Sequence, residues 1–255
     1  SSLPGKFGIG DFGPQAFQFA DFLHKSKQTY WQILPLTPPN IFADCSPYDS
    51  LSAFAGNTLL ISPEMLYKAG LLNKADISNP PVFSQNRAKF EKVLNYKSKL
   101  FDKAYDKFNF NKDFEKFCES NKYWLDDYAI FAVMVEEYKT SDWSKWPDLI
   151  NDEIKSKAEK EKFLQYIFFK QWFSLKEYCN AHGIKIIGDI PIYVAYKSAD
   201  VWAHQELFKL RNKKPVFKAG VPPDYFSKTG QLWGNPIYDW RQIKKTNYQW
   251  WMQRI

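Results

Sequence analysis

The stretch GIKIIGDIPIYV, residues 183–194, decides the fold class. Residues 163–182 before it repeat apolar side chains at helical spacing, and Gly183 stands where such a helix would stop. Residues 185–187 then predict a buried strand. A helix, a glycine and an apolar strand make up the αβ half of a βαβ unit, so we expect an α/β fold with a parallel sheet.

Asp189 lies where this strand ends. In α/β barrels the carboxyl ends of the strands carry the reacting groups, so Asp189 is a candidate site residue. An aspartate that only caps a turn would fit the local sequence equally well.

The chain before this stretch predicts further elements of the same kind. Residues 14–28 predict a helix, with Pro14 suited to its first turn, and residues 30–36 (YWQILPL) predict the first buried strand. A loop over residues 37–54 follows. Ser46 and Tyr48 lie in this loop at the place of a site loop, although both are also ordinary turn residues.

A literal GxGxxG stands at Gly8, Gly10 and Gly13. The dinucleotide-binding fingerprint must follow a strand, open a helix and be answered by an acidic residue about 20 positions later. Residues 1–7 lack the pattern of a strand, and no acidic residue follows the next strand before Asp44. We therefore reject a nucleotide site, and the sequence predicts no cofactor.

The middle of the chain, residues 62–161, is helical in pattern, with breaks at residues 109–113 and 140–147. A regular βα unit of a barrel takes roughly 30 residues, whereas about 150 separate the two predicted strands here. We therefore expect a helical subdomain inserted into an α/β scaffold. The predicted division is residues 1–61 and 162–255 as parts of one barrel, with residues 62–161 as the insertion.

The last residues predict an amphipathic helix with one face formed by Tyr248, Trp251, Met252 and Ile255. No glycine, proline or other stop signal follows. The insertion also leaves too little chain for eight strands. We therefore expect the sequence to be a fragment of a longer protein, with an incomplete barrel.

Residues 219–240, AGVPPDYFSKTGQLWGNPIYDW, combine turn formers with aromatic and polar side chains. We expect a rigid loop that presents flat apolar faces beside hydrogen-bonding groups. A pyranose ring, with C–H faces and hydroxyls, is a ligand that needs both. The alternative is a loop whose aromatic rings belong to the core, which the composition alone permits equally.

Composition limits the classes of partner. The net charge is +7, but the lysines are scattered, so we expect no nucleic-acid surface. The three cysteines form no CxxC, which favours unpaired thiols and a reducing, cytoplasmic compartment. The three histidines have no metal-ligand spacing, and no apolar run has membrane-spanning length, so we expect neither a metal site nor a membrane partner.

Several long motifs together resemble the 4-α-glucanotransferase (amylomaltase, or disproportionating enzyme) family of the α-amylase clan. They are SLPGKFGIGDFG at residues 2–13, YWQILPL at 30–36, SPYDSLSAFAGN at 46–57, GDIPIYVAYKSADVW at 188–202 and the stretch 219–240. The helical middle matches only in character. The resemblance implies a (β/α)8 barrel with helical insertions that acts on α-1,4-linked glucans.

The activity that the resemblance implies is transfer of an α-1,4-glucan segment to another maltooligosaccharide or to glucose, through a covalent glycosyl-enzyme with retained configuration. Asp189 matches the family's supporting carboxylate after the third strand, which is not the nucleophile. Matches to sugar-contacting positions follow, and they are Ser46, Tyr48, Tyr225, Phe226, Gln231 and Trp233. Asp224 and Asn235 belong to the same motif, with a role that is either sugar contact or loop shaping.

The family's nucleophile follows the fourth strand in an Arg-Ile-Asp-His type motif, and this motif does not occur within the 255 residues. The resemblance therefore implies an active parent protein and an inactive fragment. Two other readings stay open, a non-catalytic α-glucan-binding module and a hydrolytic α-amylase relative. The hydrolase is weaker, because Ile192 and Tyr193 stand where such hydrolases carry an Asn-His pair. A nucleic-acid binder comes last.

Overall fold

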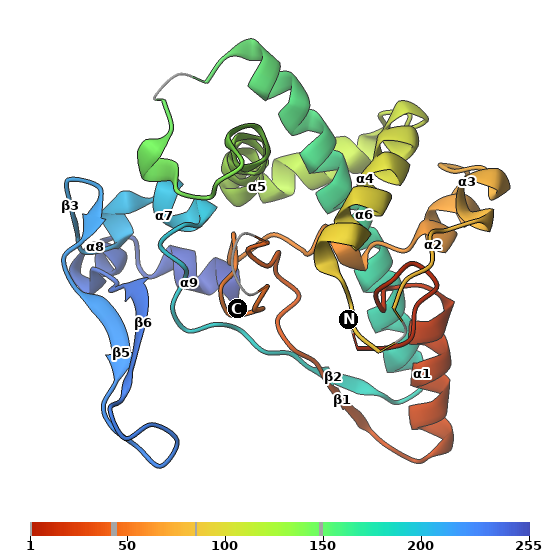
Figure 1. Cartoon of the computed structure of the whole chain (residues 1–255), viewed down its shortest axis with the longest axis horizontal. Helices are drawn as coiled ribbons and strands as arrows, with labels where there is room; N and C mark the ends of the chain where they lie inside the picture. Colours follow the sequence, from red (N-terminus) through yellow and green to blue (C-terminus); the bar gives the residue numbers. More distant parts are fainter. Residues whose placement is uncertain (1, 42–44, 85, 148–149) are drawn as a thin grey trace. The chain divides into compact units, whose positions relative to one another are not determined.

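The computed structural model describes residues 2–41, 45–84, 86–147 and 150–255. They form two compact units that alternate along the chain. The first comprises Ser1–Leu36, Gly56–Lys122 and Glu159–Asp189, and the second Thr37–Ala55, Tyr123–Ala158 and Ile190–Ile255. Figure 1 labels most of the helices and strands.

The first unit consists mainly of helices. In chain order its elements are α1 (Pro14–Lys25), β1 (Tyr30–Gln32), η1 (Thr58–Leu60), α2 (Pro63–Lys68), α3 (Lys74–Ser78), α4 (Phe90–Asp106) and β2 (Lys185–Ile187). Two long helices, α5 (Lys112–Tyr138) and α6 (Asp152–Ala181), each contribute residues to both units. The helix predicted over residues 163–182 is therefore confirmed, but it begins eleven residues earlier than its predicted start.

The end of α6 follows the predicted glycine stop. Gly183 adopts a left-handed backbone with φ of +73°. The Ile184 N–H donates to the Cys179 carbonyl over 2.9 Å, and the Gly183 N–H donates to the Asn180 carbonyl over 3.0 Å. These bonds satisfy carbonyls that the helix end would leave without a donor. The chain can therefore turn at once into β2.

The parallel pairing predicted from the sequence is confirmed, since β1 pairs with β2 in parallel with Trp31 opposite Ile186. Strand β1 is shorter than the predicted 30–36, β2 has its predicted length, and both strands are less buried than expected. Trp31 and Ile186 pack against the core, whereas their neighbours along each strand face away, as the two-residue period requires. The prediction of buried strands was wrong for most residues of this pair, because only one of its faces packs against the core.

Two glutamines of α6 join that helix to the segment that leads into η1 and α2. The Gln165 side chain accepts from the Gly56 N–H over 2.7 Å and donates to the Gly56 carbonyl over 3.1 Å. Gln171 makes the same pair of bonds with Ser62, at 2.7 and 3.3 Å. Both glutamines are buried, so each replaces the missing partner of a buried peptide group.

The Gly-rich N-terminal segment is organised by close packing. Gly8 has φ of +83°, and a Cβ there would meet the Phe83 ring at 2.4 Å. Gly13 is the N-cap of α1, and its N–H donates to Asp11 Oδ1 over 3.0 Å. The glycines therefore permit close approach of neighbouring side chains at this turn.

The second unit carries shorter elements. They are η2 (Trp143–Lys145), α7 (Ala199–Ala203), η3 (Gln205–Leu207), β3 (Leu210–Arg211), β4 (Lys214–Pro215), β5 (Lys218–Val221), β6 (Gln231–Pro236), α8 (Trp240–Lys245) and α9 (Gln249–Arg254). The β3–β4 and β5–β6 pairs are antiparallel. The terminal helix exists as predicted, but its buried residue is Trp250, whereas Met252 and Ile255 of the expected apolar face are exposed.

The helical stretch over residues 62–161 has the predicted breaks, since α4 ends at Asp106 before α5 begins at Lys112, and α5 ends at Tyr138. Residues 85, 148 and 149 of this stretch lie outside the described part. The two compact units cut the stretch between Lys122 and Tyr123 and again between Ala158 and Glu159. The expectation of one inserted helical subdomain is thus not confirmed. In the part of the chain that the structure describes, none of the helices combines the length and the hydropathy that a membrane span requires.

Candidate functional site

The stretch 219–240 folds mainly as a β-hairpin rather than as the rigid loop that we expected (Figure 1). Strand β5 pairs with β6 with Gly220 opposite Leu232 and Val221 opposite Gln231, and a register shift lies between Lys218 and Gly220. Of the turn formers that suggested a loop, Pro222, Pro223 and Gly230 lie at the tip, residues 222–230, whereas Gly234 and Pro236 lie within β6. The residues that flank the tip nevertheless pair.

The tip is held by the side chain of Asp224. Its Oδ1 accepts from the Phe226 N–H over 2.9 Å and from the Ser227 N–H over 2.8 Å. The Ser227 hydroxyl donates to the Gly230 carbonyl over 2.7 Å, and Gly230 has φ of +72°. A Cβ on Gly230 would lie 2.4 Å from the Val221 carbonyl oxygen. Asp224 therefore shapes the turn, which is one of the two roles that the sequence allowed.

Three predicted sugar-contacting aromatics project from the hairpin into solvent. Tyr225 is 97% exposed, Phe226 is 89% exposed and Trp233 is 51% exposed. The rings of Tyr225 and Phe226 pack edge to face with centroids 5.7 Å apart. Large apolar side chains that the core does not use form a surface suited to stacking on a ligand.

Trp233 has a polar neighbour on the same face of β6. Its Nε1 donates to Gln231 Oε1 over 3.1 Å, and Gln231 is exposed. The bond orients the indole and leaves the amide nitrogen of Gln231 directed elsewhere as a donor. A flat ring beside an amide is a pair of groups that can contact both the C–H face and the hydroxyls of a sugar.

The base of the hairpin is fastened to residues 190–196 of the same unit. Asn235 Nδ2 donates to the Val194 carbonyl over 2.9 Å, and Tyr238 Oη donates to the Ile192 carbonyl over 2.9 Å. Tyr238 is 1% exposed and packs against Tyr193 and Phe208. Asn235 thus anchors the hairpin. As with Asp224, this is the loop-shaping role that the sequence allowed, rather than a side chain left available to contact a sugar.

Ser46 and Tyr48 lie in a compact turn of the second unit. The Tyr48 N–H donates to Ser46 Oγ over 3.2 Å, and the Asp49 N–H donates to the Ser46 carbonyl over 3.2 Å. The Tyr48 side chain is 48% exposed. A short antiparallel bridge between Pro39 and Ser50 closes the loop around them. Residues 42–44 of this predicted site loop lie outside the described residues.

Sequence reasoning missed Asp200, which fastens the end of that loop. Asp200 is 5% exposed, and its Oδ2 accepts from the Ala53 N–H over 2.8 Å. The Leu51 carbonyl accepts from the Ala199 N–H over 2.8 Å at the same helix start. Burial raises the pKa of Asp200 to about 6, although the Ala53 N–H and the charge of Arg254 favour the ionised form. The only signal in the sequence was an acidic residue in the first turn of α7.

Asp189 follows β2 by two residues and is partly buried. It belongs to the first unit, whereas the eight other predicted site residues belong to the second. Within the second unit the structure places the hairpin residues on one element and Ser46 and Tyr48 on one turn. Among the described residues no group of three or more histidine, cysteine, aspartate or glutamate side chains could hold a metal ion.

The described site thus consists of exposed aromatic rings beside polar side chains on one hairpin, in a chain that also has a parallel strand pair. A family model described as 4-alpha-glucanotransferase matches residues 1–255. The chain therefore belongs to the 4-alpha-glucanotransferase family.

Individual relatives agree with this assignment. The 4-alpha-glucanotransferase of Clostridium butyricum is 46% identical over 272 residues, which cover 100% of this chain and 55% of that protein. The protein of the same name from Aquifex aeolicus is 42% identical over 267 residues, with 100% of this chain and 54% of that protein covered. The chain thus spans about half the length of the curated relatives that it matches.

Solved structures agree as well. The amylomaltase from Streptococcus agalactiae in complex with acarbose aligns with a TM-score of 0.91 at 39% identity, over 99% of this chain and 54% of that one. The amylomaltase from Corynebacterium glutamicum aligns with a TM-score of 0.79 at 16% identity, over 99% of this chain and 37% of that one, which shows a shared fold.

Proposed function

We propose that the protein containing this chain is a 4-α-glucanotransferase that transfers α-1,4-glucan segments between maltooligosaccharides, with glucose as a further acceptor. The observation that carries the proposal is the family match over all 255 residues, combined with a hairpin that presents three aromatic rings to solvent. A related amylomaltase was solved in complex with acarbose, which supports an oligosaccharide ligand.

In this proposal β1 and β2 are two strands of a (β/α)8 barrel. Their parallel pairing supports that assignment, since barrels of this type consist of parallel strands joined through helices. Residues 1–61 and 162–255 would contribute to the barrel, with the helices of residues 62–161 inserted between them. Asp189, two residues after β2, then stands at the carboxyl end of a barrel strand and supports the reacting carboxylates without being the nucleophile.

The hairpin is proposed as a binding surface for the glucan chain. Trp233, Tyr225 and Phe226 would stack on the C–H faces of glucose units, and the free amide nitrogen of Gln231 would donate to a hydroxyl. Ser46 and Tyr48 would line the sugar subsites beside the cleaved bond.

Transfer rather than hydrolysis requires that an acceptor sugar reaches the glycosyl-enzyme before water does. A bound acceptor with its 4-hydroxyl in place has a high effective concentration, and apolar rings over the site lower the access of water. The hairpin offers such rings on a turn that Asp224 holds in shape. A cytoplasmic location is part of the proposal, and the presence of only three cysteines in the sequence, with no CxxC motif, agrees with it.

The test is incubation of the protein expressed from its whole reading frame with maltotriose, followed by separation of products by chain length. Glucose together with oligosaccharides longer than maltotriose is the expected result. Glucose and maltose alone would instead establish a hydrolase. Binding of maltotriose without turnover would establish a non-catalytic glucan-binding module, and either of these outcomes would refute the proposed transfer.

A further inference from the structure

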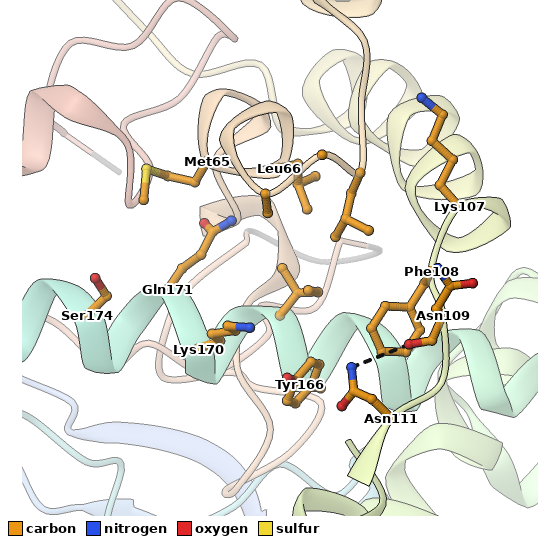
Figure 2. A pocket seen from close by; sticks show the side chains of 14 residues that line it. Met65, Leu66, Lys107, Phe108, Asn109, Asn111, Tyr166, Lys170, Gln171 and Ser174 are labelled. Atoms are coloured by element: carbon orange, nitrogen blue, oxygen red, sulfur yellow. Dashed lines mark hydrogen bonds between the residues drawn. The ribbon is translucent and has the colours of Figure 1, made fainter. Parts of the chain in front are cut away.

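The first unit contains an open pocket with a volume of about 450 Å³. It lies between α2, the turn after α4 and the middle of α6, as Figure 2 shows. None of the predicted sugar-site residues lines it. The volume falls in the range of small-molecule sites, so the pocket can enclose a ligand of the size of a sugar.

The charge of the lining has one sign. Among the described residues, two lysines, Lys107 and Lys170, line the pocket, and no acidic residue does. The floor is apolar and aromatic, with Leu66, Phe108 and Ile167 among its side chains. A site with cationic groups above an apolar floor favours an anionic ligand over a neutral one.

Some of the polar lining groups already serve the fold. Gln171 is bonded to Ser62 through both ends of its amide. Asn111 accepts from the Phe114 N–H and donates to the Asn109 carbonyl, the bond drawn in Figure 2. Lys107 Nζ donates to an asparagine oxygen of α3's N-cap over 2.8 Å. These groups shape the pocket and have little capacity left for a ligand.

Four other polar side chains of the pocket do not take part in such hydrogen bonds. Among the residues that the structure describes, no hydrogen bond or ion pair occupies the Tyr166 hydroxyl, the Asn109 amide, the Lys170 ammonium or the Ser174 hydroxyl. Tyr166, Lys170 and Ser174 are four residues apart and therefore share one face of α6, and Figure 2 shows them along the pocket. The Lys170 ammonium lies 5.5 Å from the centre of the Tyr166 ring.

We propose that this pocket binds a small phosphate monoester of the sugar phosphate class. The phosphate would pair with Lys170 and accept a hydrogen bond from Ser174, because charge-assisted bonds to an ammonium suit a dianion. The hydroxyl-bearing body would reach Tyr166 and the Asn109 amide above the apolar floor. This site shares no residue with the proposed glucan surface, so the proposal does not depend on the proposed activity.

Isothermal titration calorimetry of the whole protein with glucose 6-phosphate tests the proposal. We expect a dissociation constant on the order of 1 mM or tighter. Lys170→Met should weaken binding about tenfold or more, because it removes the charged partner and keeps the length of the side chain. Ala69→Trp, at an exposed lining position, should abolish binding by filling the pocket. The matched control is Lys176→Met, an exposed lysine of α6 outside the pocket, which should bind as the wild type does.

The proposal is overturned if glucose 6-phosphate does not bind, or if it binds equally well to the Lys170→Met and Ala69→Trp variants. Loss of binding in Trp233→Ala with unchanged binding in Lys170→Met would assign the ligand to the hairpin and overturn it too. Equal affinity for inorganic phosphate and glucose 6-phosphate would refute the role assigned to the sugar body.

Discussion

The buried ion pair of Lys97 gives the sharpest stability prediction for the first unit. The Lys97 side chain is completely buried, and Nζ lies 2.9 Å from Asp11 Oδ2 and 2.8 Å from each of the Leu59 and Ile61 carbonyl oxygens. The ammonium has three N–H groups, and each finds an acceptor. One side chain of α4 thereby joins the N-terminal segment to the residues around η1.

Replacement of Lys97 by Met keeps a long unbranched side chain and removes all three bonds. Asp11 is 8% exposed, and among the described residues only the Gly13 N–H would remain as its hydrogen-bond donor. Removing one partner of a buried ion pair costs about 3–5 kcal/mol, and orphaned carbonyl groups add to that cost. Because such terms are not additive, we expect a loss of at least about 3 kcal/mol. For a chain of this size the melting temperature would fall by about 6–12 °C.

Thermal and urea unfolding followed by far-UV circular dichroism measure this loss. The matched variant is Asp11→Asn combined with Lys97→Met, which removes the uncompensated charge and keeps an oxygen for the Gly13 N–H. We expect the double variant to recover about 1–2 kcal/mol over Lys97→Met alone. A single variant within about 1 kcal/mol of the wild type, or a double variant less stable than the single one, would refute the proposed role of the pair.

Four further predictions concern the second unit. Trp233→Ala, which removes a half-exposed ring, should raise KM for maltooligosaccharides about tenfold, and initial rates over a range of maltotriose concentrations measure it. Gly230→Ala should distort the hairpin tip and raise KM, because the added Cβ would lie 2.4 Å from a carbonyl oxygen at a residue with φ of +72°. The control is Gly70→Ala, which has a similar φ of +76° but open space around the added Cβ. Asp224→Asn should keep KM near the wild-type value because the amide oxygen can still accept the two backbone bonds, while Asp224→Ala should raise it. Burial raises the pKa of Asp200 from 3.8 to about 6, so the folded state binds more protons between these values, and unfolding free energy should fall by up to about 3 kcal/mol as pH rises through this range. Urea titrations at pH 4.5 and 7 should show a smaller fall in Asp200→Asn, and an equal fall in both proteins would contradict the assignment.

Elements that are fixed by neighbouring residues could be predicted from the sequence. Helix α1 begins at Pro14 as expected, and α6 ends before Gly183 because the glycine permits the left-handed turn. The parallel pairing of β1 and β2 followed from the order of helix and strand. These features depend on local periodicity and stop signals, which a single sequence shows directly.

Features that depend on distant partners could not be predicted in the same way. Lys97 and Asp11 are 86 positions apart, and the sequence gives no sign that they form a buried ion pair. The bonds of Gln165 and Gln171 span 109 positions. In the stretch 219–240 the prolines and glycines suggested a loop, because two short strands separated by a nine-residue tip leave little alternation to detect.

The structure also separates residues that the sequence motif had grouped. The side chains of Asp224 and Asn235 form hydrogen bonds with the backbone of the tip and of Val194, so in the proposed glucan site they would contribute the shape of the hairpin. The rings of Tyr225 and Trp233 contribute less to the packing of the fold, since Tyr225 is 97% exposed and Trp233 is 51% exposed. In the proposed glucan site these exposed rings would lie on a tip that Asp224 already holds in shape, which would lower the entropic cost of binding. In this chain the motif thus contains two kinds of residue, those that shape the hairpin and those whose side chains are exposed on it.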